Sequence, residues 1–114
     1  MSISSGVSDV FLGVAQHDAS ALEGLFKARL DNLEASGLDP KTYSLANIAA
    51  LIASDAAPAS YVFQVGLALE AGVTPEEMLG LLVALNPTVG NIRIVSAAAE
   101  IAFALGIDLD ADLG

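Results

Sequence analysis

The segment EAGVTPEE, residues 70–77, carries the clearest structural signal in this chain of 114 residues. Thr74 is a favourable N-cap and Pro75 fits the first helical position. Glu77 stands three residues after the cap, where its carboxylate can reach back to the backbone N–H of the cap and complete a capping box. Gly72 suits the left-handed residue that follows a helix. The segment therefore predicts the end of one helix and the start of the next.

Comparable boundaries divide the rest of the chain. Asp39-Pro40 and Pro58 are typical of helix starts, whereas Gly37 and Gly106 are typical of helix ends. Asn86-Pro87 predicts a further boundary, because a residue before proline avoids the helical region. The expected helices span residues 8–16, 20–36, 40–52, 58–71, 75–85 and 89–105. We therefore predict an all-α fold, a compact bundle of about five or six helices in a single domain over residues 1–114.

Apolar residues recur at spacings of three and four along these helices, and this pattern gives each helix an inward stripe. The helix after Pro40 has no charged side chain between Lys41 and Asp55, so we expect it to be buried nearly all round. The predicted core consists of Leu25, Leu45, Ile48, Ile52, Val65, Leu69, Leu81, Leu82, Ile94 and Ile101.

The charge balance excludes several classes of partner. Fourteen acidic side chains stand against four basic ones, a formal net charge of −10, and such a field repels phosphate groups. We expect no nucleic-acid partner and no anionic membrane surface. No apolar run reaches the roughly 20 residues of a bilayer span. The start of the chain does not resemble a secretory signal, so we expect a cytoplasmic protein.

Metal and cofactor chemistry finds little support in the sequence. The chain contains no cysteine, which removes thiol catalysis, disulfides and zinc–thiolate sites together. Asp108, Asp110 and Asp112 have the spacing of a calcium loop, but the required glycine at position 6 and acid at position 12 are missing. We expect an acidic solvated tail over residues 107–114, an exposed His17, no metal and no cofactor.

Two motifs carry a family resemblance. The pattern Leu-Asp-Pro-Lys-Thr-x-Ser-Leu at residues 38–45, followed by EAGVTPEE at residues 70–77, resembles the carboxymuconolactone decarboxylase family, which includes the alkylhydroperoxidase D-like proteins. The likeness covers about residues 37–106. It implies a helical fold and assembly into trimers, hexamers or related oligomers. The scarcity of charged residues also indicates a self-associating chain, so we expect a homo-oligomer, with a trimer or hexamer favoured.

The resemblance places the family's catalytic positions on residues that cannot perform thiol chemistry. Counted back from Glu70, the Cys-x-x-Cys-x-x-x-His motif of the peroxidase branch falls on Ala57, Ser60 and Gln64, and an upstream glutamate falls on Ser44. A thiol peroxidase needs a thiolate and a base. These four degenerate positions supply neither, so we expect no peroxidase activity.

The decarboxylase branch fits no better. Its histidine would also fall on Gln64, and it usually has a basic residue at the position of Tyr43. A di-acid lactone requires cationic groups, and Arg93 is the one nearby cation. We expect Arg93 to form an ion pair with Glu100, seven residues further along the same helix.

Polar side chains within otherwise apolar helices are the candidate ligand-binding residues: Tyr43, Asn47, Ser60, Gln64 and Arg93. An unpartnered buried amide costs about 1–3 kcal/mol, so we expect Asn47 and Gln64 to face each other, a water molecule or a ligand. Two functions stay open. One is a divergent family member that binds, or acts as a lyase-like enzyme on, a small organic metabolite at the degenerate site. The alternative is a non-catalytic oligomeric scaffold or binding protein.

Overall fold

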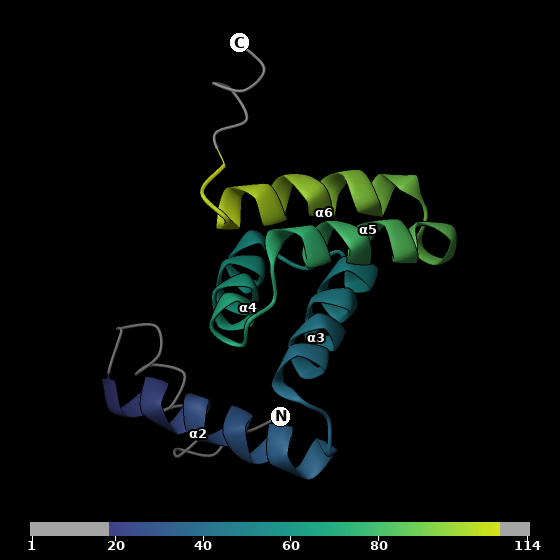
Figure 1. Ribbon diagram of the computed structural model, residues 1–114. Coiled ribbons are helices and arrows are strands. Elements are labelled where there is room, and N and C mark those ends of the chain that lie inside the picture. Colours follow the sequence, from purple (N-terminus) through teal and green to yellow (C-terminus); the bar gives the residue numbers. More distant parts are fainter. Residues whose placement is uncertain (1–18, 108–114) are drawn as a thin grey trace, which may run out of the picture. The chain divides into compact units, whose positions relative to one another are not determined.

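In the described part of the chain, residues 19–107, the computed structural model contains helices joined by short turns, and no strand. Its five helices are α2 (Ala19–Ser36), α3 (Pro40–Ser54), α4 (Pro58–Glu70), α5 (Pro75–Val89) and α6 (Asn91–Ala104) (Figure 1). The prediction of an all-α fold is confirmed. The helix expected over residues 8–16, His17 and the acidic tail from residue 108 lie outside the described residues.

The chain divides into two compact units, residues 1–38 and residues 39–114, and each is considered by itself. Helix α2 belongs to the first unit. Its exposed Lys27 and Asp31 form an ion pair of 2.9 Å one turn apart, as expected for oppositely charged residues at this spacing. Leu25 on this helix is 43% exposed. Its predicted place in the core is therefore wrong, because the core is built from the helices of the second unit.

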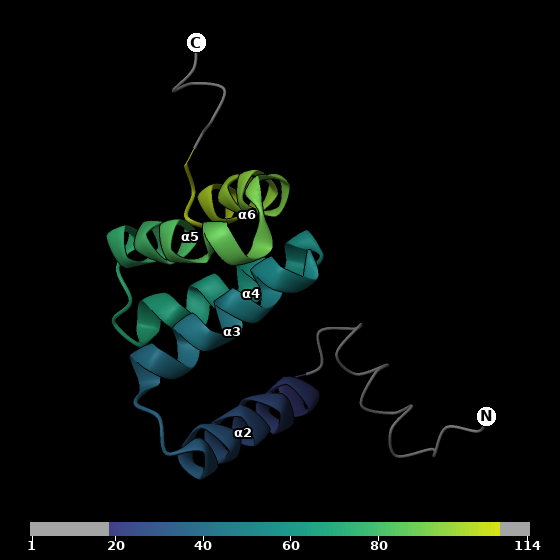
Figure 2. The same cartoon turned by 90° about the vertical axis from the view of Figure 1, so that its right-hand side faces the viewer.

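Helices α3–α6 form two layers in the second unit. Helices α3 and α4 lie side by side in one layer, and α5 and α6 lie side by side in the other (Figures 1 and 2). A single residue, Gly90, joins α5 to α6, and its φ of 89° is a conformation that favours glycine. Helix α6 also packs against α3 and α4, so the layers share one apolar core.

The helix starts follow the local signals. The Asp39 carboxylate accepts a hydrogen bond of 2.8 Å from the backbone N–H of Thr42, which caps α3. At the start of α5, the Glu77 N–H donates to Thr74 Oγ1 at 3.1 Å, and the Thr74 N–H donates to Glu77 Oε1 at 3.0 Å. The capping box is confirmed.

Glu77 also joins two helix starts that are far apart in the sequence. Its Oε1 atom lies 3.0 Å from Nζ of Lys41, in the first turn of α3. The capping carboxylate of α5 thus has a cationic partner from the other layer. This ion pair connects the two motifs that carried the family resemblance.

Helix α5 does not end at Asn86-Pro87 as predicted, but continues to Val89 with Pro87 inside its last turn. A proline removes one backbone hydrogen bond from a helix interior, and near the end of α5 this loss is confined to the final turn. Leu85 and Val89 pack against the core from this same turn. Their burial offsets the unfavourable helical conformation of the residue before proline.

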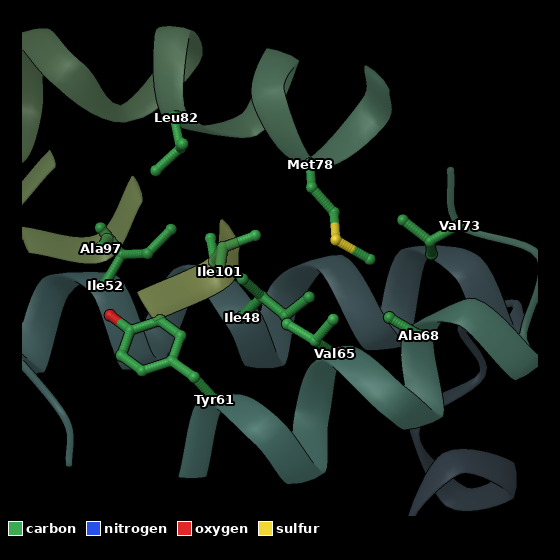
Figure 3. Packing of buried hydrophobic residues seen from close by; sticks show 10 residues of the cluster. All are labelled: Ile48, Ile52, Tyr61, Val65, Ala68, Val73, Met78, Leu82, Ala97 and Ile101. Atoms are coloured by element: carbon green, nitrogen blue, oxygen red, sulfur yellow. The ribbon is translucent and has the colours of Figure 1, made fainter. Parts of the chain in front are cut away.

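The core contains ten residues from all four helices and from the α4–α5 turn: Ile48, Ile52, Tyr61, Val65, Ala68, Val73, Met78, Leu82, Ala97 and Ile101 (Figure 3). Half of the predicted core is confirmed here, and Leu45, Leu81 and Ile94 pack against its edge. Leu69 is exposed, and its prediction is wrong. The smaller Ala68 occupies the inward position of α4 instead.

Helix α3 is buried on one face only. The buried face carries Ser44, Ile48 and Ile52 at a spacing of four residues, whereas Ala46 and Ala50 are exposed. The expectation of burial nearly all round is therefore wrong for the single chain. The absence of charged residues left the buried face undefined, and the packing of α4 and α6 selected it.

Glu77 is expected to make the stability of the fold depend on pH. The hydrogen bond from the Thr74 backbone, followed by the contact with Lys41, holds the pKa of Glu77 below its usual value, which is about 4.3. The charged carboxylate therefore stabilises the fold above that usual value, and this contribution is lost as the pH falls through the lowered folded pKa. We expect Glu77→Gln to lower the free energy of unfolding at pH 7, and the difference from wild type to shrink as the pH falls below the usual value and through the lowered folded pKa.

Urea titrations at a series of pH values measure this effect. Glu76→Gln is the matched control, because it removes the same charge one residue earlier without removing a capping contact. Equal effects of the two variants at pH 7 would contradict the assigned role of Glu77.

Candidate functional site

The four degenerate positions lie on α3 and along α4 from its N-cap residue to its middle, and these two helices pack against each other. Ser44 is only 2% exposed and continues the core stripe of Ile48 and Ile52. The position expected for the upstream glutamate is therefore part of the apolar core. It can hold a small hydroxyl group, but it has no solvent access for an ionised side chain.

The other three positions follow one flank of α4. Ala57 is the N-cap residue and is exposed, whereas Ser60 and Gln64 are half-buried. Spacings of three and four residues place them on one side of the helix. The Ser60 backbone N–H donates to the Ala57 carbonyl at 3.0 Å, which closes the first turn. The flank offers a hydroxyl and an amide, neither of which is a general base.

Asn47 has a partner within its own helix. Its Nδ2 atom donates to the backbone carbonyl of Tyr43 at 2.9 Å, one turn earlier. From the sequence, its amide was expected to face Gln64, a water molecule or a ligand. In the structure, the acceptor is instead a backbone carbonyl of the same helix, and it belongs to the nearly buried Tyr43. The amide nitrogen is therefore satisfied without a ligand.

Arg93 acts on the end of a neighbouring helix. Its Nη1 atom donates to the backbone carbonyl of Ala53, in the last turn of α3. The last carbonyls of a helix lack partners within the helix and carry partial negative charge, so the guanidinium group is well placed there. The predicted ion pair between Arg93 and Glu100 is wrong, because this long-range contact engages the arginine instead.

Tyr61 is a polar core residue that is not among the predicted ligand-binding residues. It is almost completely buried on α4, and its hydroxyl points toward the side of the core where Ile52 and Ala97 lie (Figure 3). Burial raises the pKa of the phenol, and the negative charges of Asp55 and Glu100 raise it further. Tyr61 therefore stays protonated at neutral pH. The feature of the sequence that could have pointed to Tyr61 is its position directly after Ser60, one of the four degenerate positions.

A cavity of about 310 Å³ lies between α5 and α6, and its lining is mostly apolar. None of the predicted site residues contributes to it. Space for the cavity is left by two small residues one turn apart on α6, Ala98 and Ala102. This pair of alanines is the feature of the sequence that could have indicated the cavity. Its lining residues are Pro75, Glu76, Met78, Leu79, Leu82, Ala98, Ile101, Ala102, Leu105 and Ile107.

Within residues 19–107, no group of three or more His, Cys, Asp or Glu side chains could hold a metal ion. No helix in this range has both the length and the apolar character needed to cross a membrane.

Comparison with known proteins gives one match. The sequence model of the carboxymuconolactone decarboxylase family matches residues 19–104, which is most of the chain and extends from the start of α2 to the end of α6. Searches of curated proteins and of solved structures give no match.

Proposed function

The chain belongs to the carboxymuconolactone decarboxylase family, and we propose that it is a member without thiol chemistry that functions as a self-associating binding protein. The four positions that would hold the relay of the peroxidase branch carry Ser44, Ala57, Ser60 and Gln64. With no cysteine in the chain, no thiolate can form elsewhere to replace them. The loss of this chemistry supports a role in binding or assembly.

The observation that carries the proposal is the large number of exposed apolar side chains. Eight lie on the helices of the second unit that follow α3: Val62, Phe63, Leu69, Leu79, Val83, Ile92, Val95 and Phe103. Soluble monomers rarely expose extended apolar patches, and such surfaces usually mark interfaces. A second copy of the chain would remove this surface from water. By analogy with the family, a trimer or hexamer is favoured.

A second candidate function is the binding of a small organic metabolite at the degenerate site. The supporting observation is that half-buried Ser60 and Gln64 share one flank of α4, next to the helix that carries Tyr43 and Ser44. Hydroxyl and amide groups in a mostly apolar setting are the usual means of orienting a small ligand.

Native mass spectrometry, with sedimentation equilibrium at micromolar concentration, tests both candidates. We expect a mass that is a multiple of the 11.5 kDa chain. A monomer under both methods would overturn the proposed self-association. An additional bound mass that disappears in Gln64→Leu, but persists in the exposed-hydroxyl control Ser54→Ala, would support the metabolite candidate. Its absence from all samples would favour the scaffold role.

A further inference from the structure

Helix α6 has an apolar stripe on its outer side as well as on its core side. The core side carries Ala97 and Ile101, which are buried. The outer side carries Ile92, Val95 and Phe103, which are 87%, 70% and 70% exposed. A helix that is apolar on opposite sides is normally covered on both.

The outer stripe of α6, defined here as Ile92, Val95, Ala99 and Phe103, runs the length of the helix. Its spacings of three, four and four residues place these side chains in one line. No charged residue interrupts it. The two charged residues of α6, Arg93 and Glu100, are seven residues apart, so they lie on the same flank of the stripe, about two turns from each other.

We propose that the outer stripe of α6 is a contact between two copies of this chain, packed antiparallel about a twofold axis near the level of Ala97. This inference rests on the proposed self-association and specifies its interface. In this register Ile92 faces the partner's Phe103, and Val95 faces the partner's Ala99. Large side chains thereby meet at the ends of the contact, and the small Ala99 allows close approach near its centre.

Charge complementarity selects the antiparallel arrangement. A twofold axis that lies in the contact plane, perpendicular to the helices, keeps each flank of the stripe on the same side and reverses the helix direction. Arg93 then meets the partner's Glu100, and the same pair forms a second time by symmetry. A parallel arrangement would bring Arg93 level with the partner's Arg93 and form neither pair.

Arg93 is positioned for this role by its contact within the chain. One of its five N–H donors is used by the Ala53 carbonyl, which fixes the guanidinium group at the flank of α6. The remaining donors can bind a carboxylate of the partner copy.

A twofold contact also constrains the size of the assembly. Both copies use the same patch, so the contact closes after two chains. A dimer satisfies it, and so does a hexamer in which three such pairs surround a threefold axis. A closed trimer does not.

Charge reversal tests the register. We expect Arg93→Glu and Glu100→Arg each to weaken association by about tenfold or more, because each variant brings two like charges together at both ends of the contact. The double variant restores opposite charges, so its association should return close to wild type. Sedimentation equilibrium measures the dissociation constant, and circular dichroism with thermal melting verifies the fold.

Two controls separate this effect from structural damage. Lys27→Glu makes the same change of net charge as Arg93→Glu, but on α2, and should leave association unchanged. The contact between Arg93 and Ala53 is lost in the double variant too, so restored association there cannot come from that contact. Val95→Asp, at an exposed position, should abolish the contact while the helical spectrum is retained.

A cross-link provides a separate measurement, because the natural chain has no cysteine. Val95→Cys and Ala99→Cys chains, co-expressed and oxidised, should form a mixed disulfide-linked pair, and Val95→Cys alone should form far less. A disulfide requires Cα atoms within about 7 Å, so this outcome reports the antiparallel register directly.

The outcomes distinguish the inference from the proposal that it rests on. A monomeric wild type overturns both. An oligomer whose mass does not change with the α6 variants, a closed trimer, or a double variant as weak as the single ones overturns the α6 contact alone and leaves self-association standing.

Discussion

Replacing Ile52 with alanine is expected to lower the free energy of unfolding by about 2–5 kcal/mol. Ile52 is fully buried and belongs to the cluster that joins both layers of helices. Truncation removes three methyl or methylene groups from water-free surroundings and leaves a cavity that rigid neighbouring helices fill only in part. A loss of this size is a large fraction of the stability of a small domain.

Urea denaturation measures this loss. All samples are compared at one fixed chain concentration, because association also contributes to apparent stability. The control is Glu70→Ala, at the exposed end of α4, where we expect a change below about 1 kcal/mol. Similar losses at the two positions would show that the core assigned here does not control folding.

Restoring the missing relay is expected to damage the fold before it restores catalysis. Ala57→Cys with Ser60→Cys supplies a dithiol, but Gln64 cannot act as its base, so the thiols should keep a pKa around 8.5. Gln64→His and Ser44→Glu are then needed to complete the relay. Ser44 lies in the core stripe of α3, and an unpaired carboxylate buried there should cost several kcal/mol.

Two measurements test this expectation. We expect wild type and the double-cysteine variant to consume a hydroperoxide no faster than free-thiol chemistry in the presence of a dithiol reductant. We expect Ser44→Glu to lower the melting temperature strongly, while Ser54→Glu, at the exposed end of α3, changes it little. Turnover by metal-free wild type above that of a heat-denatured sample would refute the assignment of the relay positions. A stable Ser44→Glu variant would refute the burial argument.

The sequence determined the helix boundaries wherever the signal was local. Thr74, Pro75 and Glu77 lie within one turn, and their capping interactions form once that turn forms. Asp39 with Thr42 is a second example. The loss of thiol chemistry could also be predicted from the sequence, because it depends on which functional groups the chain contains and not on where they lie in the fold.

The packing of whole helices sets which faces are buried and which long-range partners meet. Ala68 is buried and Leu69 is exposed, since the direction from which neighbouring helices pack outweighs the size of a side chain. Pro87 remains helical because the last turn of α5 packs against the core. Lys41 contacts Glu77, which is 36 positions further along the chain. Arg93 contacts Ala53, which is 40 positions earlier. Local sequence encodes interactions within a turn or two, whereas these contacts depend on how whole helices pack.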